Sequence, residues 1–438
     1  MKYEKYKDSG VEWIGEIPEH WEVTRLKNLI EVHYSGVWGN ESDESINDRN
    51  CIRIADFDFG NLTINEKNLT KRNYSDKEIE KYELRKGDIL VEKSGGGDKT
   101  PVGRVVFFGL EESSLYANFI EMLRVKSVLK KFIAYLLSSM YHSGLIYTMF
   151  NQTTGIQNLN IPKYITQNIV LPKDNFEQEK IAIYLDKKTE KIDSIIKSLE
   201  DQKENLEQYK RELIAEVVTK GLNNNIPMKD SGVDWIGEVP EHWEVFPLFY
   251  IYKENKNKNI GNMNSNLLSL SYGKIIRKDI ETTFGLLPES FENYQVVKSG
   301  DIILRLTDLQ NDKRSLRTGL VNEEGIITSA YIGLRNTKKV SNEYMHYLLH
   351  FYDLKKVFYS MGSGLRQSLS FSDIRRIPLL LPPIEEQISI VDKLNAKQDE
   401  INKTKENIHR QMEKLKEYRK ILIHEAVTGK VKIDGGVK

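Results

Sequence analysis

The chain contains two copies of one sequence, and this duplication restricts its fold more than any other feature. KDSGVEWIGEIPEHWEV begins at Lys7 and KDSGVDWIGEVPEHWEV begins at Lys229. Fifteen of these seventeen positions are identical, and the two exceptions exchange Glu for Asp and Ile for Val. Such a repeat predicts two equivalent halves. Because the chain has 438 residues, each half is long enough to bury a core of its own.

The two halves continue to match beyond this repeat. EKYELRKGDILVEKSGG begins at Glu80 and ENYQVVKSGDIILRLTD at Glu292, and both carry a Gly-Asp turn into an apolar run typical of a buried strand. Helical spacing follows in FIAYLLSSMYHSGLIYTMF and EYMHYLLHFYDLKKVFYSM. Each half is therefore predicted to contain a globular part that mixes helices and strands.

Apolar residues at seven-residue intervals form the strongest periodic signal in the sequence. The remaining positions in these stretches are mostly charged or amide-bearing, which predicts two long helices with one packing stripe each. Since neither helix can bury its stripe alone, we expect the two to pack on each other as an antiparallel pair. The stripe positions are Leu185, Ile192, Leu199, Leu206 and Leu213 in the first half, and Leu394, Ile401, Ile408, Leu415 and Leu422 in the second.

These elements predict an α+β fold with two pseudo-twofold-related globular domains, separated by two long antiparallel coiled-coil helices. The order along the chain is globe, helix, globe, helix. The expected boundaries are 1–172 for the first globular domain, 173–221 for the first long helix, 222–382 for a linker and the second globular domain, 383–430 for the second long helix, and 431–438 for a tail.

Composition excludes several classes of protein. Lys plus Arg equals Asp plus Glu at 64 each, so any DNA-binding surface must be local. The single cysteine, Cys51, cannot form an internal disulfide or a thiolate metal cluster, and no metal site is expected. No apolar run reaches the roughly 18 residues of a membrane span, and the first residues lack an apolar signal core. We therefore expect a cytoplasmic protein.

The repeated segment contains aromatic and histidine residues whose role is expected to be structural. His20 and His242 have no Cys, Asp or His partner at catalytic or metal-ligand spacing. The tryptophans are expected to pin a proline-stiffened segment against each globe or helix end. These tryptophans are Trp13, Trp21, Trp235 and Trp243.

A loop follows the Gly-Asp strand in each half. KSGGGDKTPVG resembles a phosphate-binding loop but departs from GxxxxGK[ST], because Asp98 precedes Lys99, and the matching RLTDLQNDKRSLRTG has no glycine run. A nucleotide site is therefore not expected. Both loops instead carry side chains that suit DNA bases and phosphates. The candidates are Lys93, Ser94, Gly95, Lys99 and Arg104 in the first loop, and Arg305, Thr307, Asn311, Lys313, Arg314 and Arg317 in the second.

A second pair of matched loops precedes the long helices. NQTTGIQNLNIP begins at Asn151 and SMGSGLRQSLSFSDIRRIP begins at Ser360. Two interpretations stay open: a polar connector that caps the following element, or a contact with nucleic acid. The second interpretation adds the candidates Gln152, Thr153, Gln157, Asn158, Ser363, Arg366 and Gln367.

Catalysis by this chain is not expected. A metal-dependent nuclease could be sought in Asp88 and Glu92, but the equivalent residues in the second half are Asp301 and Arg305, so the acidic pair is not shared. The sequence has neither a glycine-rich AdoMet loop nor an Asn-Pro-Pro-aromatic motif. No catalytic residue is assigned.

In combination, these motifs resemble the specificity subunit of a Type I restriction-modification system, the HsdS family. The resemblance rests on the WIGEIPEHWEV-type segment, the GDIL and SGG features, the GIQNL-type connector and the LPxxxxEQ start to a long helix, and it covers residues 3–430. It implies that the globes are target recognition domains, similar to those of adenine-N6 DNA methyltransferases. It also implies that the helices dock modification subunits.

The resemblance further implies a non-catalytic subunit that reads an asymmetric bipartite DNA site. Each recognition domain would read one half-site, with the two half-sites about one helical turn apart. The implied partners are double-stranded DNA, two modification (methyltransferase) subunits and, through the complex, restriction (translocase/nuclease) subunits. No cofactor is implied in this chain, because AdoMet, ATP and Mg would belong to the partner subunits.

A different class of protein is also compatible with the repeat. A two-headed coiled-coil scaffold that binds only proteins would have the same architecture, and the zero net charge supports it. Its interactions would show no DNA sequence preference and no counterion-release dependence on salt.

Overall fold

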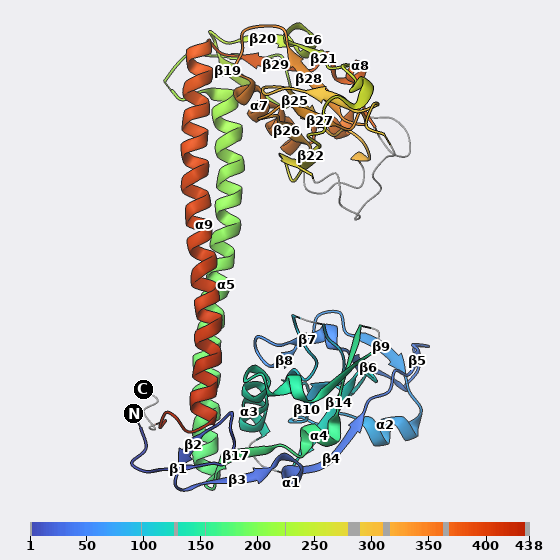
Figure 1. The fold of residues 1–438 in the computed structure, drawn as a ribbon, viewed down its shortest axis with the longest axis vertical. Helices are drawn as coiled ribbons and strands as arrows, with labels where there is room; N and C mark the ends of the chain where they lie inside the picture. The colour runs from blue at the N-terminus through green and yellow to red at the C-terminus, as the bar shows by residue number, and fades with distance from the viewer. Residues whose placement is uncertain are drawn as a thin grey trace. The chain divides into compact units, whose positions relative to one another are not determined.

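The structure is a computed structural model that describes residues 2–97, 99–126, 130–153, 155–223, 225–278, 290–309, 316–361 and 368–433 (Figure 1). The chain forms two compact units, of which the first comprises Met1–Glu200 and His409–Lys438, and the second comprises Asp201–Ile408. The boundary between the units falls inside both long helices. Each unit therefore contains one globular domain and one half of each long helix, and each is described by itself.

The two long helices are α5 (Asn175–Lys220) and α9 (Ile384–Val427). Asp174 precedes α5, and its carboxylate accepts a hydrogen bond from the backbone N–H of Phe176 at 3.0 Å, which satisfies a donor of the first turn. Both helices stop just before a glycine with a φ of +74°, Gly221 and Gly429. This left-handed conformation is a common helix terminator.

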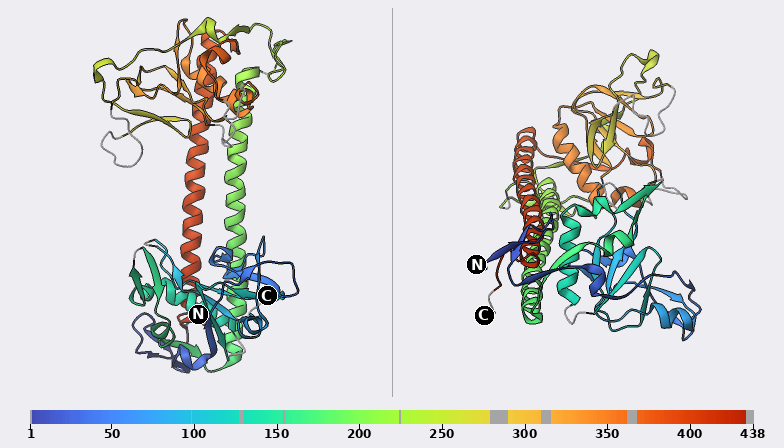
Figure 2. Two further views of the ribbon diagram at one scale, coloured as in Figure 1. Left: turned by 90° about the vertical axis from the view of Figure 1, so that its right-hand side faces the viewer. Right: turned by 60° about the horizontal axis from the view of Figure 1, so that its bottom comes forward.

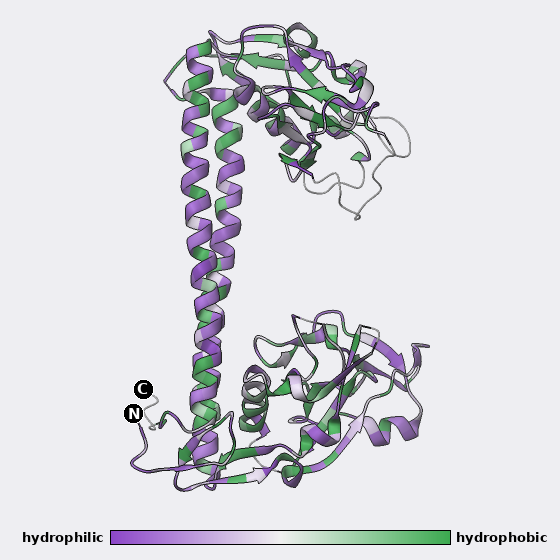
Figure 3. Ribbon diagram, viewed as in Figure 1, coloured by the Kyte–Doolittle hydropathy of each residue, from purple (hydrophilic) through white to green (hydrophobic). Residues whose placement is uncertain are grey.

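The predicted stripe faces the interior of the helix pair. Figure 3 shows α5 and α9 coloured mainly as hydrophilic, with hydrophobic bands along them. In the first unit Leu422 of α9 lies in the same core as Leu185 of α5, and in the second unit Leu394 of α9 lies with Ile214 of α5. The start of each helix thus packs beside the end of the other (Figure 2), and the predicted antiparallel arrangement is confirmed. Seven stripe residues are buried, while Leu206, Leu213 and Leu415 are partly buried.

The globular domain of the first unit is built on a four-stranded antiparallel sheet. Its strand order is β12 (Val105–Phe107), β10 (Ile89–Glu92), β14 (Ile120–Val125) and β4 (Ile30–Ser35). Helix α3 (Lys130–His142) buries most of its residues in the core that the sheet shares with the long helices. A second sheet has the order β13 (Ser114–Tyr116), β6 (Asp48–Ile52), β9 (Thr70–Asn73) and β5 (Asn40–Glu41).

The globular domain of the second unit repeats this central sheet. Its strand order is β26 (Thr318–Leu320), β25 (Ile302–Leu304), β28 (Ile332–Asn336) and β21 (Tyr252–Glu254), also antiparallel. Helix α7 (Asn342–Leu354) corresponds to α3, and Ser341 caps it by accepting a hydrogen bond from the backbone N–H of Tyr344 at 3.2 Å. The two halves therefore share the same four-stranded sheet and the same covering helix, as the repeat predicts. We call this shared arrangement of sheet and helix the frame.

The Gly-Asp turn that the sequence repeats holds this frame together. The carboxylate of Asp88 accepts two hydrogen bonds from Arg124, Nε at 2.9 Å and Nη2 at 2.6 Å, and it also accepts the backbone N–H of Arg85 at 2.8 Å. In the second unit Asp301 accepts the same two bonds from Arg335. Hydrogen bonding to the carboxylate is the main cause that raises the pKa of both arginines. Each pair locks two central strands of the sheet.

The repeated WIGE segment fastens each globe to the start of a long helix. In the first unit β1 (Tyr6–Asp8) pairs with β2 (Glu16–Pro18), and β3 (Trp21–Arg25) pairs with β17 (Asn168–Pro172). The second unit repeats this with β18 (Met228–Asp230), β19 (Glu238–Pro240), β20 (Glu244–Pro247) and β29 (Pro378–Leu381).

All four tryptophans of the repeat contact a long helix or a globular domain, as the sequence predicts. Trp21 is fully buried and its indole N–H donates to Glu177 of α5 at 3.2 Å, and Trp243 is equally buried and donates to Glu386 of α9 at 3.1 Å. Each preceding histidine contacts the same glutamate at 2.8 Å. Trp13 is partly buried against the first core, with its ring centre 6.3 Å from that of His424 near the end of α9. Trp235 is 39% exposed, with its ring against Tyr352 of α7. These two therefore also contact a helix end or a globular domain, with less burial.

No helix in the described ranges combines the length and the apolar character required to span a membrane. These residues also contain no group of three or more His, Cys, Asp or Glu side chains arranged to hold a metal ion.

Candidate nucleic-acid interface

The structure joins the two candidate loops of the first half into one small sheet. β11 (Ser94–Gly95) comes from the loop after the Gly-Asp strand, whereas β15 (Phe150–Thr153) and β16 (Ile156–Leu159) form a hairpin before the first long helix. The strand order is β11, β16, β15, so Ser94 lies opposite Asn158 and Gln152 lies opposite Gln157. We call this three-stranded sheet the platform. It unites residues that are about sixty positions apart in the chain.

Side-chain hydrogen bonds fix the platform internally. The hydroxyl of Ser94 donates to Oδ1 of Asn158 at 2.7 Å. Gln157 is 2% exposed, and its Oε1 accepts the backbone N–H of Val102 at 3.1 Å. Gln157 therefore serves the connector interpretation, because its amide oxygen is engaged within the protein.

The glycine run after Ser94 is required by close packing. Gly96 has a φ of +63°, and a Cβ at this position would lie 2.8 Å from Oε1 of Gln157 and 2.9 Å from the backbone nitrogen of Val102. A side chain would therefore be strained by its backbone conformation and would also collide with its neighbours. This gives a structural reason for the run that needs no bound phosphate.

Several candidate side chains of the first half remain accessible around the platform. Lys99, Gln152 and Asn158 are exposed. Lys93 is partly buried, and its Nζ donates to the hydroxyl of Ser35 at 2.6 Å, which places the lysine beside the end of β4. These residues supply two cations, amide groups and a hydroxyl on and beside the platform, with Gln152 and Asn158 on opposite faces of the hairpin. Such groups can bond to DNA phosphates and base edges.

Phe119 belongs to the same surface and was not found by sequence reasoning. Its carbonyl accepts the backbone N–H groups of Lys93 at 2.8 Å and Ser94 at 3.2 Å, while its side chain is 54% exposed. An aromatic residue just before a buried strand is normally interpreted as core. The sequence therefore contained no signal that this ring is accessible.

Arg104 does not project from the loop as a free cation. Its guanidinium makes two hydrogen bonds with Glu92, Nε to Oε2 at 2.7 Å and Nη2 to Oε1 at 2.9 Å, and its Cζ lies 3.8 Å from the ring centre of Phe59. Glu92 is 2% exposed. This bidentate buried pair favours a structural role for Arg104 over the expected DNA contact. It also neutralises the carboxylate that a nuclease site would have required.

Arg317 of the second half is enclosed by the protein, which favours a structural role over the expected DNA contact. It is 3% exposed, and its guanidinium donates to three carbonyl oxygens, those of Arg305 at 3.0 Å, Thr307 at 2.6 Å and Asp308 at 2.9 Å. The side chain braces the loop from inside and is not accessible to DNA in this conformation. Residue type alone could not reveal this burial.

The second half keeps the connection between its two loops. The backbone N–H of Leu369 donates to the carbonyl of Leu306 at 2.8 Å, just as Leu159 donates to Lys93 at 2.8 Å. Arg305 is exposed and Thr307 is partly exposed at this junction. The remaining candidates of this half lie outside the described residues: Asn311, Lys313, Arg314, Ser363, Arg366 and Gln367. The side chain of Thr153 in the first half is also outside the description.

The fold and this surface define a class of protein. Two globular domains share one frame and one pair of helices, and each joins polar loops of different sequence at the same place. This architecture defines a duplicated two-domain protein in which the two halves differ in the loops available for binding, and the fold alone does not assign a function.

Comparison with known sequences identifies the family. The profile of the type I restriction modification DNA specificity domain matches residues 18–208 and 318–410, and the chain belongs to this family. A Methanocaldococcus jannaschii sequence named for the MjaX type I restriction enzyme specificity subunit is 27% identical over 433 residues, covering 96% of each chain. The MjaVIII specificity subunit of the same organism is 25% identical over 302 residues, or 65% of this chain and 67% of that one.

Solved structures share the fold at low sequence identity. A chain from a study of complex assembly and conformational transition of the type I R-M system aligns with a TM-score of 0.67 at 14% identity, covering 95% of this chain and 99% of that one. The HsdS subunit from Thermoanaerobacter tengcongensis aligns with a TM-score of 0.52 at 15% identity, over 95% and 98% of the two chains. These likenesses confirm the predicted α+β architecture with its long helices.

Proposed function

We propose that this specificity-family chain reads an asymmetric bipartite DNA site, with one half-site for each globular domain, and docks two methyltransferase subunits. One observation carries the proposal: two equivalent frames present different loop sequences at the same position. The loops Lys93–Gly103 and Arg305–Gly319 follow equivalent strands but share almost no residues. A conserved frame with divergent loops supports two different half-sites.

The platform and the lysines beside it supply the chemistry for reading the first half-site. The amides of Gln152 and Asn158 can bond to adenine, while Lys93 and Lys99 suit phosphates. In the second domain the exposed Arg305 can form a bidentate contact with guanine. Asn311, Lys313, Arg314, Ser363, Arg366 and Gln367 stay candidates by residue type and by their place in the matched loops.

The duplicated frame also supports the proposed stoichiometry. Two equivalent sets of surfaces can bind two identical subunits, since each subunit meets the same repeated segment and an equivalent fold in its own half. The subunits would then address adenines on opposite strands and perform any base flipping themselves. Restriction subunits would join through the complex. The proposal places the chain in the cytoplasm, together with DNA.

We further propose that the chain is non-catalytic and holds no cofactor of its own. AdoMet, ATP and Mg would be bound by the partner subunits. Support comes from the first domain, where the carboxylates of Asp88 and Glu92 are both occupied by arginines. Neither carboxylate is free to act as a metal ligand in this arrangement.

The scaffold alternative makes opposite predictions about DNA. Its support is the balanced charge, 64 basic and 64 acidic residues. A scaffold would not bind DNA, whereas a specificity subunit would bind DNA with a sequence preference and with an affinity that falls as salt rises. Titration with two unrelated DNA sequences at two salt concentrations separates the two.

The decisive experiment is to express the chain with its cognate methyltransferase subunit and map methylated adenines across the genome by single-molecule sequencing. We expect a two-part motif with an unspecified spacer that disappears when this gene is deleted. Unchanged methylation in the presence of a stable protein complex would refute DNA specificity and favour the scaffold.

A further inference from the structure

One turn of the first domain presents two exposed side chains beside the platform. Residues 117–120 connect β13 to β14, and the backbone N–H of Ile120 donates to the carbonyl of Ala117 at 3.0 Å, which closes a β-turn. Asn118 and Phe119 occupy its two central positions. Both are exposed, and Phe119 is 54% exposed. An amide and an aromatic ring are therefore adjacent on one turn.

Backbone hydrogen bonds hold this turn on two sides. On the side of the platform, the carbonyl of Phe119 accepts the N–H groups of Lys93 at 2.8 Å and Ser94 at 3.2 Å. On the side of β4, the N–H of Gly36 donates to the carbonyl of Ile120 at 3.0 Å, and a Cβ at Gly36 would lie 2.5 Å from another carbonyl oxygen of the turn. The backbone of the turn is thus fixed before a ligand arrives, which reduces the entropy cost of binding.

The second domain has the same turn with different side chains. It spans 328–331, just before β28, and the backbone N–H of Tyr331 donates to the carbonyl of Thr328 at 3.2 Å. Ser329 and Ala330 occupy the central positions, and the hydroxyl of Ser329 donates to a carbonyl oxygen of its own domain. The amide and the ring of the first domain are therefore replaced by a hydroxyl and a methyl group.

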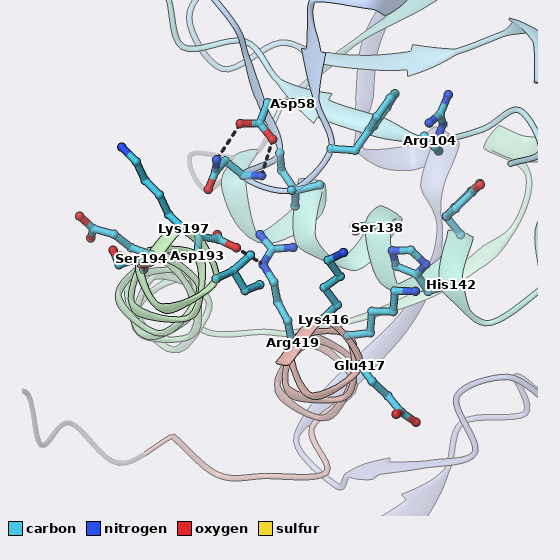
Figure 4. Close-up of a pocket in the computed structure, with 18 of the residues that line it drawn as sticks. Asp58, Arg104, Ser138, His142, Asp193, Ser194, Lys197, Lys416, Glu417 and Arg419 are labelled. Atoms are coloured by element: carbon cyan, nitrogen blue, oxygen red, sulfur yellow. Dashed lines mark hydrogen bonds and ion pairs between the residues drawn. The ribbon is translucent and has the colours of Figure 1, made fainter. Parts of the chain in front are cut away.

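A large hollow of the first unit suits DNA less well than this turn. It lies between α3, α5, α9 and the connection from β7 (Phe57–Asp58) to β8 (Thr63–Ile64), with a volume of about 1180 Å³. Six carboxylates and five Lys or Arg side chains line it, and an ion pair links Arg419 to Asp193, with Nε 3.5 Å from Oδ1 (Figure 4). Such a lining has no net attraction for a phosphate backbone.

The two side chains of the turn match the groups that one base pair displays. In the major groove adenine presents N7 and its N6 amino group, to which an Asn amide can form two hydrogen bonds, and its partner thymine presents a methyl group. This methyl is the only apolar group in the major-groove pattern. A ring without polar atoms therefore gains free energy from a base edge mainly by covering that methyl.

We infer that the turn at 117–120 reads an A·T base pair of the first half-site, with Phe119 on the thymine methyl and Asn118 on the adenine edge. This inference rests on the proposed function, because it assigns residues to a DNA site that the function requires. It adds two residues that determine specificity and the base pair that they select. The turn of the second domain, with Ser329 and Ala330, does not make this selection.

The test removes the thymine methyl groups of the target one at a time. The methylation map of the wild-type complex gives the two-part motif, and duplexes with uracil in place of each thymine are titrated with the full chain and its methyltransferase subunit. We expect one thymine whose replacement weakens wild-type binding by about fourfold, the effect of one buried methyl group. With Phe119→Ala the same replacement should have no effect.

The adenine contact is tested by the methylation map of a second variant. Asn118→Ala should reduce discrimination at the same base pair by at least about fivefold. Loss of discrimination at a different base pair would overturn the joint reading by the two side chains.

Phe176→Ala is the matched control, because Phe176 is 59% exposed in the same unit but lies at the start of α5. It should respond to uracil as the wild type does, and hydrogen exchange of β14 checks that Phe119→Ala keeps its fold. Wild-type tolerance of uracil at every thymine would overturn the inference without any variant. Equal losses for thymine and uracil duplexes in Phe119→Ala would also overturn it and would indicate a ring that inserts between bases.

A wild-type methylation map without a two-part motif would instead contradict the proposed function, before any variant is made. A motif that is present, but indifferent both to uracil and to Phe119→Ala, would leave the proposed function intact and remove only this inference. The two failures are therefore distinguishable.

Discussion

Arg124 and Asp88 join two adjacent strands of the first domain through two hydrogen bonds, at 2.9 and 2.6 Å, in an interior where Asp88 is fully buried. Arg335 and Asp301 repeat the arrangement in the second domain. The pair explains why the sequence repeats a Gly-Asp turn. The aspartate both closes its own turn and binds an arginine of the neighbouring strand in the sheet, β14 in the first domain and β28 in the second.

Removing one partner of this pair should destabilise the first domain selectively. Asp88→Ala leaves the Arg124 guanidinium buried without its carboxylate, and we expect a loss of roughly 3 to 5 kcal/mol. Hydrogen exchange of β10 and β14 measures the loss locally, and the strands β25 and β28 should keep their protection. Lys86→Gln, which breaks an exposed ion pair with Glu111, is the control and should have little effect. Equal loss of protection in both domains would contradict the assignment.

Of the two glycines that follow the platform strand β11, Gly97 should tolerate substitution by alanine and Gly96 should not. Gly96→Ala places a Cβ within 3.0 Å of Gln157 and Val102 at a φ of +63°, so we expect a cost of at least about 1 to 2 kcal/mol and loss of the first half-site from the methylation motif. Gly97→Ala meets nothing within 4 Å and should preserve the motif. If both variants kept the motif, the platform would not be part of the reading surface.

Accessible residues of the platform and of the loop that follows β11 should separate base reading from phosphate binding. We expect Gln152→Ala to relax the choice of base at one position of the first half-site, at a cost of about 1 to 3 kcal/mol in discrimination. Lys99→Ala should weaken binding to all sequences and lower the slope of log affinity against log salt by about 0.9. Both are measured by DNA titration, with the exposed Lys77→Ala as control. A change confined to the second half-site would argue against this assignment.

Acid should weaken the second domain through two histidines of α7. Burial lowers the pKa of His346 and His350 to about 4, from an unfolded value near 6.5. Between these values the unfolded chain binds more protons, so this contribution to stability is complete above pH 6.5 and is lost as the pH falls toward 4. Nearby Lys210 and Arg211 further disfavour the charged form of His350.

Urea unfolding followed by hydrogen exchange of α7 at several pH values checks this expectation. His346→Gln should flatten the acid dependence, whereas His409→Gln, which changes an exposed histidine of α9, should leave it unaltered. A flat profile in the wild-type chain would show that neither histidine is held neutral by the fold.

Local patterns in the sequence predicted the frame well. The seven-residue spacing identified the stripe. Leu185, Ile192 and Leu199 are buried as predicted, because their spacing along one helix is enough to show that they share a face. The repeat predicted the equivalence of the halves, which appears as the same strand order in both central sheets.

These local patterns could not predict which residues far apart in the sequence contact one another. Arg124 lies 36 positions from Asp88, and Ser94 lies 64 positions from Asn158, so no local signal connects either pair. Local patterns also cannot predict whether a given side chain is exposed to solvent. Arg317 and Arg305 are equally basic in the sequence, but only the structure shows that one is enclosed by carbonyl oxygens and the other is exposed.

The boundary between the two compact units, which falls inside α5 and α9, has a consequence for folding during synthesis. The core that contains Trp21 and Leu185 also contains Leu422, Ile423, Ala426 and Val427, whereas the second unit is one continuous stretch, 201–408. During synthesis the second unit therefore has all its residues before the first unit is complete. The amino-terminal domain completes its core only after the last residues of the chain leave the ribosome. A premature stop near residue 409 would consequently destabilise the amino-terminal domain and leave the second unit, 201–408, complete.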